Sequence, residues 1–596
     1  MKSHATMMYR FLSMACMTAL ICLFAAGCKK GPVAIATVSG DDGSLWEQVS
    51  LAGFGDKNNV SIVSMCEFQN SIYAVTRNDV TGFQIWRTAG LSWEQVQAPG
   101  FTDSVLHASM NNVWGDMIVF NDKLYVAVSS GIQGSKLYKS IGFEIWRYDG
   151  TTWEALVSHT LGPQVTGTIT GIASCGAGDG STTADFTDSA AAWTTDQFKG
   201  GILWITSGSG KGRVFNIVGN TAKMVTVQQN EAAATAEDTV CAAQTITADS
   251  GFPPYTIGAI AVGDSYKIIK GITANGFGEL WNKAICDLEV YNGKLYAALG
   301  FNYEQGARIW KSSDGTTWEP SSAYSMGSYH GYDNNGSPTG FCLVPGQELR
   351  NGQPVSSSLP KLGKFTVDGE EILVVGGTGT QGCNGRGLRV FRLYGDEWKA
   401  IVDYFVDSNT TGTNENGMGD DGGGDGFFGS NFQAWSWAQY DGKLFTGIGR
   451  LMGGRIMYTP NADPEDGNWF YAVGKTSSQP DGLGYNPNIA FNIFTYDDST
   501  LIAGTIDEES IARPVIPKQR GADLYWATGK ADALTWTTIT KTGFGDSTVQ
   551  QFEASGKFFS GDFYISASSF NPATAPGAGR AGYTGAKVYR LASTLR

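Results

Sequence analysis

Short apolar runs alternate with tight polar turns along most of the chain, and one arrangement of them recurs. Its clearest copy lies at 121–156, where an apolar strand follows a polar turn, a loop leads to a second strand, and Asp149-Gly150 separates that strand from a third that opens at Trp153. Asp-Gly between alternating apolar segments is typical of a two-residue hairpin turn, which needs positive φ at both central positions. The pattern therefore predicts antiparallel β-strands.

The strand after the polar turn can be counted seven times, and so can the next strand. The first occurs at Ile72-Tyr73, Leu124-Tyr125, Leu295-Tyr296, Ile372-Leu373, Leu444-Phe445, Leu501-Ile502 and Phe563-Tyr564. The second occurs at Ile85-Trp86-Arg87, Ile145-Trp146-Arg147, Ile309-Trp310-Lys311, Val390-Phe391-Arg392, Ile456-Met457-Tyr458, Leu524-Tyr525-Trp526 and Val588-Tyr589-Arg590. A Trp opens the last strand after only six of these hairpins, at Trp93, Trp153, Trp318, Trp398, Trp469 and Trp536.

The missing seventh Trp has a counterpart at the start of the chain. Trp46 has the same sequence surroundings as Trp93, but no hairpin precedes it. Repeats of about 40–50 residues with four strands each indicate a β-propeller. We therefore expect an all-β, seven-bladed β-propeller, built from 45–160 and 275–596, with an N-terminal closure strand near 45–50 that leaves no open sheet edge.

The repeat is interrupted once, by a segment at 161–274 that is rich in Thr, Ala, Gly and Ser. Its recognisable features are a Thr-Asp-Ser before Ala-Ala-Trp193, Asp196-Gln197-Phe198, Ile205-Thr206-Ser207-Gly208 and Gly219-Asn220-Thr221-Ala222. With these features the segment resembles a small β-module of phage structural proteins and large bacterial surface proteins. The resemblance implies an inserted β domain and no chemistry, and a disordered linker is the alternative.

The N-terminus predicts export. Lys2 and Arg10 flank a short polar region, the apolar run that follows is too short to span a bilayer comfortably, and Ala25-Ala26-Gly27-Cys28 resembles a bacterial lipobox. The resemblance implies a lipoprotein signal peptide at 1–27, lipidation of Cys28, and an anchor and linker at 28–44. Lys29 resembles the outer-membrane sorting choice, so we expect a lipid-anchored protein of the cell outer membrane. An ordinary signal peptide is the alternative.

The net charge excludes some classes of binding partner, and the cysteines predict disulfide bonds. The formal net charge of −14 makes nucleic acid and anionic lipid surfaces poor partners. In an oxidising compartment we expect disulfides between Cys175 and Cys241 and between Cys342 and Cys383, because each pair lies within one local unit. Cys66 and Cys286 fall on inner strands of blades that are not neighbours, so we expect free buried thiols.

Long segments fall at one kind of position. The turns between the first and second strands of each blade are tight, whereas the long segments, including 320–365, 403–433, 504–522 and 567–585, link blades or join second to third strands. In a propeller these two kinds of loop emerge on one face, here named the long-loop face, and the tight turns form the opposite, plain face. Binding usually resides in elaborated loops on a rigid scaffold.

A family resemblance rests on the hairpin Ser312-Ser313-Asp314-Gly315-Thr316-Thr317-Trp318. It is similar to the Asp-box of sialidase-type propellers, although it is one residue short and the later repeats lack it. Kelch repeats share the Gly-Lys-Leu-Tyr strand, but their Gly doublet occurs only at Gly376-Gly377. The resemblance implies a propeller and leaves the activity open.

Three groups of side chains are candidates for binding. Asp420, Asp421 and Asp425 lie in a Gly-rich stretch whose oxygens suit Ca²⁺, with a solvated acidic loop as the alternative. Side chains alternate along a strand, so we expect Trp435 and Trp437 on one side of one inner strand. There they are either packed between sheets or exposed at the mouth of the channel, where they could stack on sugars. His330 lies on a long segment of the long-loop face.

No catalytic motif is recognisable, so two functions remain open. The first is a non-catalytic, envelope-anchored propeller that binds a protein or a glycan through its long-loop face. The alternative is a glycan-processing enzyme, a sialidase-like glycosidase or a lyase, that uses carboxylates on the same face. The absence of a recognisable enzyme motif favours the non-catalytic binding function.

Overall fold

The computed structural model describes residues 36–593, apart from the ranges 103–113, 130–141, 176–182, 229–240, 247–254, 301–306, 322–359, 378–388, 403–432, 508–519 and 570–583 and shorter gaps of four residues or fewer. Within these residues the regular structure consists of β-strands and short 3₁₀ turns, and no helix is long and apolar enough to cross a membrane. The protein is all-β, as expected.

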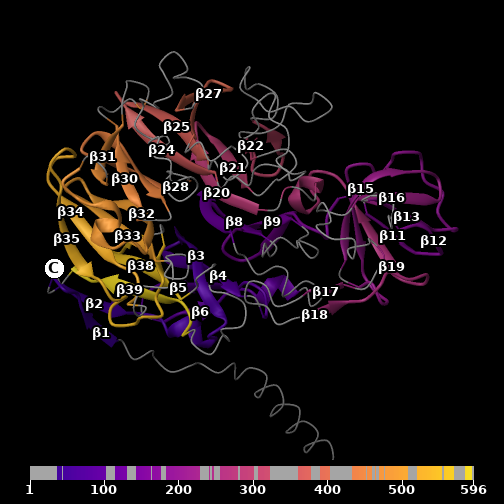
Figure 1. Cartoon of the computed structure of the whole chain (residues 1–596), viewed down its shortest axis with the longest axis horizontal. Helices are drawn as coiled ribbons and strands as arrows, with labels where there is room; N and C mark the ends of the chain where they lie inside the picture. The colour runs from indigo at the N-terminus through magenta and orange to yellow at the C-terminus, as the bar shows by residue number, and fades with distance from the viewer. Residues whose placement is uncertain are drawn as a thin grey trace, which may run out of the picture.

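Five separate four-stranded antiparallel sheets follow one another around a common centre (Figure 1). Four of them are β3 (Asn59–Phe68), β4 (Ser71–Asn78), β5 (Ile85–Thr88) and β6 (Glu94–Gln95); β7 (Gly115–Phe120), β8 (Lys123–Ser129), β9 (Phe143–Tyr148) and β10 (Trp153–Val157); β20 (Ala284–Tyr291), β21 (Lys294–Gly300), β22 (Arg308–Ser312) and β23 (Glu319–Pro320); and β24 (Lys361–Val367), β25 (Glu370–Gly377), β26 (Arg389–Tyr394) and β27 (Glu397–Val402). The fifth is β28 (Gln433–Tyr440), β29 (Lys443–Gly449), β30 (Arg455–Tyr458) and β31 (Phe470–Val473). The arrangement is that of a β-propeller.

The remaining propeller-like strands belong to one ten-stranded sheet, so the structure does not divide into the seven separate sheets that the sequence predicts. Its strands are β1 (Ala36–Ser39), β2 (Leu45–Gln48), β32 (Asn488–Asp497), β33 (Thr500–Asp507), β34 (Leu524–Thr528), β35 (Thr535–Thr540), β36 (Gln551–Phe552), β37 (Lys557–Phe559), β38 (Asp562–Ser568) and β39 (Lys587–Leu591). The merger has a local cause, because the short strand β36 pairs with both β33 and β38.

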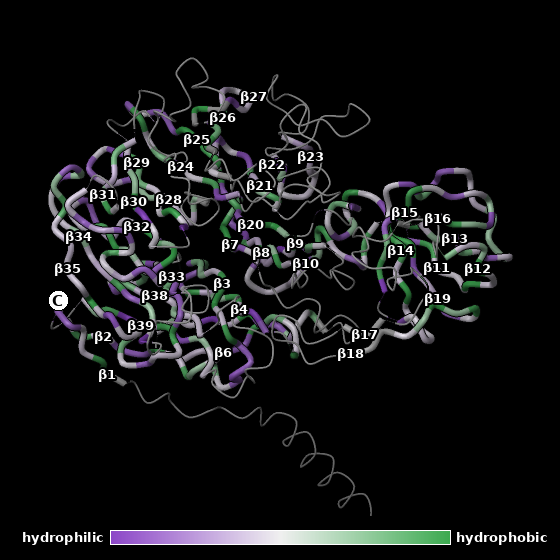
Figure 2. The backbone as a smooth tube through the Cα atoms, viewed as in Figure 1, coloured by the Kyte–Doolittle hydropathy of each residue, from purple (hydrophilic) through white to green (hydrophobic). Residues whose placement is uncertain are grey.

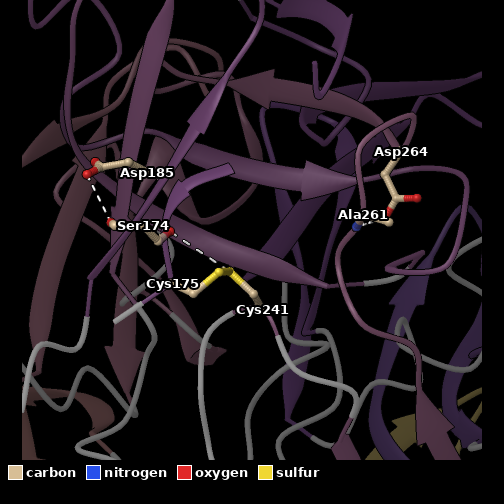
Figure 3. The surroundings of a disulfide bond; sticks show 6 residues. All are labelled: Ser174, Cys175, Asp185, Cys241, Ala261 and Asp264. Atoms are coloured by element: carbon tan, nitrogen blue, oxygen red, sulfur yellow. Dashed lines mark hydrogen bonds between the residues drawn. A yellow bond between two sulfur atoms is a disulfide. The ribbon is translucent and has the colours of Figure 1, made fainter. Parts of the chain in front are cut away.

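The segment that interrupts the repeat forms a seven-stranded sheet on one side of the molecule (Figure 1). It comprises β11 (Gln164–Thr168), β12 (Gly171–Ser174), β13 (Thr183–Thr187), β14 (Ile202–Ile205), β15 (Val214–Asn220), β16 (Met224–Gln228) and β19 (Ser265–Ile269), with a separate hairpin of β17 (Gln244–Ile246) and β18 (Tyr255–Ile257). A core of its own, which includes Phe186, Phe215 and Tyr266, lies against this sheet. Cys175 and Cys241 are joined by a disulfide bond beside Ser174 (Figure 3).

Tight turns join the first and second strands of the sheets, as their Asn, Asp and Gly residues predict. Asn121-Asp122 and Asn292-Gly293 have positive φ at both positions, the geometry that suits the twist of paired strands. Hydrophobic residues line strands of the central sheets and of the seven-stranded sheet alike (Figure 2). Because these turns join first to second strands, they lie at one end of the sheets, and the connections from second to third strands begin at the opposite end.

A second recurring device precedes the first strand of several sheets, and sequence analysis missed it. It is a short 3₁₀ turn with a Gly and then a large side chain at positive φ: η1 (Ala52–Gly55), η2 (Pro99–Thr102), η3 (Asn275–Gly278) and η6 (Asp481–Gly484). The ring of Phe54 stacks on Trp86 at 4.9 Å and meets Trp93 at 5.1 Å. A non-Gly residue at positive φ costs roughly 1–2 kcal/mol, which the burial of the ring, about 1.5–3 kcal/mol, offsets.

Candidate functional site

The first strands of the sheets contact one another around the centre, and a group of charged side chains meets there near the long-loop face. We name as the central site Asp116 of β7, Asp287 of β20, Lys361 of β24 and Glu553, which follows β36. Asp116, Asp287 and Lys361 are half-buried and Glu553 is buried. Side chains from four different sheets are therefore brought to one place by the ring arrangement.

The two aspartates link neighbouring first strands. Asp116 Oδ1 accepts a hydrogen bond from Ser64 Oγ at 2.8 Å, and its Oδ2 accepts one from Leu288 N at 2.9 Å. Asp287 Oδ2 accepts a hydrogen bond from Leu362 N at 2.8 Å. Each carboxyl group thus reaches from its own strand to the backbone of the next.

Lys361 completes this group. Its Nζ donates to Cys286 O at 2.6 Å and lies 3.5 Å from Asp287 Oδ1. Burial, together with the neighbouring charge of Asp116, raises the pKa of Asp287 well above its usual range, although Lys361 works in the other direction. Burial opposes the charge of Lys361, but Asp287 and Asp116 outweigh it and raise the pKa of the lysine. Two close carboxyl groups cannot both ionise easily, so Asp287 holds its proton to a higher pH than an ordinary aspartate does.

Glu553 is a second buried acid. It contacts Ser61 of β3, whereas Asp116 contacts Ser64 of the same strand. Its Oε1 accepts hydrogen bonds from Ser61 Oγ at 3.0 Å and from Ser568 Oγ, and its Oε2 accepts one from Gln551 Nε2. Burial raises the pKa of Glu553 to about 7, against these hydrogen bonds and against the charge of Lys361. An acid with a pKa near neutral exchanges its proton readily under ordinary conditions.

Two indole rings meet near the central site. The ring centroids of Trp114, which directly precedes β7, and Trp435 of β28 lie 6.0 Å apart. Their sheets are separated in chain order by those of β20 and β24, so the pair joins parts of the ring that are not sequence neighbours. Trp435 is half-buried and packs against Ile489 and Ala490.

The expectation that Trp435 and Trp437 share one side of their strand is wrong. The register of β28 against β29 shifts between Ala434 and Ser436, so a β-bulge at Trp435 breaks the alternation. Trp437 faces the preceding sheet, where its Nε1 donates to Lys361 O at 3.0 Å. Trp435 contacts the following sheet instead and lies beside Trp114, whereas the ring of Trp437 lies 6.3 Å from that of Trp469.

Most of the other predicted site residues lie outside the described residues. These are Cys28, His330, Cys342, Cys383, Asp420, Asp421 and Asp425. Among the described residues no group of three or more His, Cys, Asp or Glu is placed to hold a metal ion. Cys66 and Cys286 are buried free thiols, and burial raises their pKa values to about 11 and about 12.

The central site was missed, although one signal for it is present in the sequence. Asp116 and Asp287 each lie five positions before the Asn of a tight turn, in otherwise similar strands that run Asp-Met-Ile-Val-Phe and Asp-Leu-Glu-Val-Tyr. Ser64 and Ser436 occupy the same position in their strands. A carboxylate at the same position of two apolar strands indicates that both carboxylates lie near the centre of the ring. The sequence does not show that the two carboxylates contact each other.

The comparisons with known proteins give only distant likenesses. No family profile matches the chain, and no curated protein matches it. Among solved structures, a polysaccharide lyase described as ulvan lyase is 10% identical at a TM-score of 0.40, covering 88% of this chain and 93% of its own. An α-L-arabinofuranosidase from Fusarium graminearum is 10% identical at 0.36, covering 94% and 98%, and Sqt1 of Saccharomyces cerevisiae is 9% identical at 0.35, covering 90% and 96%. Likenesses at this level carry no argument about the activity of this chain.

Proposed function

We propose that the protein is a glycan-processing enzyme whose acid–base chemistry takes place at the central site. The observation that carries the proposal is the Asp116–Asp287 pair beside Lys361, in which burial and the neighbouring carboxylate raise the pKa of Asp287. This is the enzyme alternative of the sequence analysis, and the buried carboxylates move it ahead of the non-catalytic reading.

Cleavage of a glycosidic bond needs such a pair of groups. A carboxylic acid with a raised pKa protonates the leaving oxygen, and a carboxylate assists water or the sugar carbon on the other side. In our proposal Asp287 donates its proton to the bridging oxygen, water adds to the sugar carbon, and the proton released by water returns to the Asp116–Asp287 pair. Lys361 stabilises the pair in the interval when both carboxyl groups are ionised.

The tryptophan pair supplies a reason to expect a sugar. Trp114 and Trp435 present apolar ring faces beside charged groups, and such faces combine a large contact area with a defined orientation. A sugar ring offers an apolar face of C–H groups and a rim of hydroxyl groups. The two indole rings would stack on the apolar face of the sugar, and the charged groups would contact its hydroxyl groups.

The test is turnover of a broad glycan panel by the full-length protein purified in detergent, read by mass spectrometry. Hydrolysis adds the mass of water across the two products, whereas a lyase leaves an unsaturated sugar of unchanged total mass. We expect products from the wild type and from Asp122→Asn, an exposed plain-face turn residue, and none from Asp287→Asn. Equal turnover by Asp287→Asn and the wild type would refute the assignment.

A second candidate function, a binding scaffold, is favoured by one observation. Asp116 and Asp287 each accept a backbone N–H from the neighbouring first strand, which is also what a purely structural carboxylate would do. On this reading a glycan or an envelope protein binds to the long-loop face and remains intact. Retention of panel members without any product, in the wild type and in Asp287→Asn alike, would support it.

We further propose that the ten-stranded sheet comprises two blades, β32–β35 and β37, β38, β39 and β2, which gives seven in all. In support, β2 pairs with β39, and the Phe544 ring lies 4.7 Å from Tyr589 and 5.5 Å from Trp46, as Phe54 lies beside Trp86 and Trp93. Trp46→Ala would then cost about 3–5 kcal/mol of stability in urea unfolding. A loss no larger than that of the exposed Phe470→Ala would refute closure by β2.

We also propose that the chain is held at the outer membrane by lipid on Cys28, with the segment 161–274 as an inserted domain. The lipobox resemblance supports the first and the separate core of the seven-stranded sheet supports the second. Mass spectrometry of the N-terminal peptide of protein from membranes would find a lipid-modified Cys28. Cleavage elsewhere, or an unmodified Cys28, would refute the anchor.

A further inference from the structure

Five first strands carry a hydrogen-bonding side chain at one equivalent position, which we name the belt position. Its residues are Ser64, Asp116, Asp287, Ser436 and Asn492, which lie opposite Val75, Ala127, Ala298, Gly447 and Gly504 of the second strands. In β3, β20 and β28 the register shifts directly before the belt position, and such β-bulges re-aim the neighbouring side chains.

The belt side chains join their own strands to neighbouring strands of the ring. Ser436 Oγ accepts a hydrogen bond from Ile493 N at 2.7 Å, and Asn492 Nδ2 donates to Phe552 O at 2.8 Å. The two aspartates make the corresponding contacts to backbone N–H groups. Because an uncharged side chain makes this contact in two sheets, the carboxyl groups of the two aspartates are not needed for it.

Ser64 differs from the other members of the belt because its contact includes a carboxyl group. Its Oγ donates to Asp116 Oδ1 at 2.8 Å and accepts from Met117 N at 3.3 Å. Met117 N also donates to Asp116 Oδ1 at 2.8 Å, and Leu288 N donates to Asp116 Oδ2 at 2.9 Å. Both oxygens of Asp116 therefore face donors, which is how a carboxylate, an acceptor only, is held.

Asp287 is held in another way. Its Oδ2 accepts from Leu362 N at 2.8 Å, and its Oδ1 lies 3.5 Å from Lys361 Nζ. Donors to one of two close carboxyl groups stabilise the negative charge there, and the second group then holds its proton more strongly. The contacts of Ser64 thus divide the pair into a carboxylate and an acid.

We propose that Ser64 is a positioning residue of the central site, which holds Asp116 in the ionised role and so leaves the transferable proton on Asp287. The proposal rests on the enzyme function proposed above, in which one carboxyl group acts as acid and the other as carboxylate. Ser64 acts only through Asp116 and does not contact the substrate in this scheme. The other titratable groups that act at this place are Cys66, Glu67, Glu289, Lys361, Lys364 and Lys557.

The experiment compares Ser64→Ala with Ser436→Ala in the full-length protein. Both variants lose a belt contact, but only Ser64→Ala removes a donor from Asp116. With a glycan that the wild type cleaves, we expect the kcat of Ser64→Ala to fall about tenfold, the effect of one hydrogen bond to a charged group. We also expect the acidic limb of its pH–rate profile to move to higher pH, because the carboxylate forms less readily. Ser64→Thr keeps the hydroxyl and is expected to restore the limb, and Ser436→Ala is expected to leave it in place.

A second measurement needs no substrate, because it follows urea unfolding of the same variants against pH. A hydrogen bond that favours ionised Asp116 stabilises the folded state at neutral pH and is lost as the pH falls through the range where aspartates titrate, about pH 4. The destabilisation caused by Ser64→Ala is therefore expected to shrink at low pH. It is expected to stay constant with pH when Asp116→Asn is also present, and so is the destabilisation caused by Ser436→Ala.

The failures of the two proposals are distinguishable. If the wild type cleaves a glycan and Ser64→Ala keeps the wild-type acidic limb, Ser64 is not a positioning residue and the proposed function stands. If the wild type cleaves nothing, the proposed function is refuted, and the unfolding measurement alone decides whether Ser64 holds Asp116 ionised. Equal destabilisation by Ser64→Ala at low and at neutral pH would overturn the proposal in either case.

Discussion

Acidic side chains at the two ends of the same sheets behave in opposite ways. On the plain face, Asp149 Oδ1 accepts hydrogen bonds from Thr152 N at 2.7 Å and Thr151 N at 2.8 Å in open solvent, and these bonds lower its pKa to about 2. Asp314 repeats the arrangement with Thr317 N and Thr316 N. At the centre, burial raises the pKa of Asp287 and of Glu553.

The difference shows why a strong motif and a functional site need not coincide. Asp149 and Asp314 stand in the most recognisable turns of the chain, yet solvent and several backbone donors keep them ionised over the whole ordinary pH range. Asp287 stands in an unremarkable strand, yet burial beside a charged neighbour raises its pKa, and perturbed pKa values of this kind cluster at functional sites. The environment therefore decides which acid is a candidate for chemistry.

The largest expected effect is on turnover at the central site. Asp287→Asn removes the exchangeable proton and keeps the shape of the side chain, so we expect glycan turnover to fall by about 10²–10⁴-fold, the usual contribution of general acid–base catalysis. Initial rates on the substrate found in the panel would measure it. Asp314→Asn, at the opposite end of a sheet, provides the matched control and is expected to keep the wild-type rate.

The second effect is on stability at the same place. Lys361→Met leaves the Asp116–Asp287 pair without its cation, and breaking such a buried pair costs about 3–5 kcal/mol, of which we expect the lower end because Lys361 is half-buried. Urea unfolding would measure it. The double variant Lys361→Met with Asp287→Asn is expected to lose less than the sum of the two single variants, and strict additivity would contradict direct coupling.

The third effect is a pH dependence of stability. A carboxyl whose folded pKa is raised to about 7 from an ordinary 4.5 binds more protons in the folded state between these values, so stability falls as pH rises through that window and is flat above it. The loss is about 3 kcal/mol at most. Glu553→Gln is expected to flatten this part of the profile and to be more stable than the wild type at pH 8.

Asp287 and Glu289 also have raised pKa values and contribute slopes of the same sign, so the informative quantity is the difference between the two profiles. Identical slopes for Glu553→Gln and the wild type between pH 5 and 7 would contradict the raised pKa of Glu553.

The smallest effect is at the plain face. Asp314→Ala removes hydrogen bonds that form in solvent, so we expect a loss of less than about 1 kcal/mol and unchanged turnover. Since the pKa of Asp314 is lowered, its contribution is present above pH 3.8 and disappears as pH falls through the lowered value. Thermal unfolding at pH 7 would measure the loss, and a loss as large as that of Lys361→Met would erase the contrast between the two ends.

Local patterns predicted local structure well. The Asn-Asp and Asn-Gly pairs before the second strands form tight turns with positive φ, and the alternating runs around them are antiparallel strands. The position of Trp435 was not predictable from alternation, because a single bulge between Ala434 and Ser436 redirects it. The number of separate sheets was likewise changed by the two residues of β36, which pair on both sides.

The sequence by itself determined that this protein is all-β, that its strands repeat as hairpins, and where its tight turns and long segments lie, because turn geometry and strand alternation depend on residues a few positions apart. Only the tertiary structure decided which acids meet. Asp116 and Asp287 come from different sheets, and Ser64 reaches Asp116 from a third. Burial, and with it the raised pKa of a carboxyl group, arises from neighbours that are distant in sequence, and the ring of sheets brings those neighbours together.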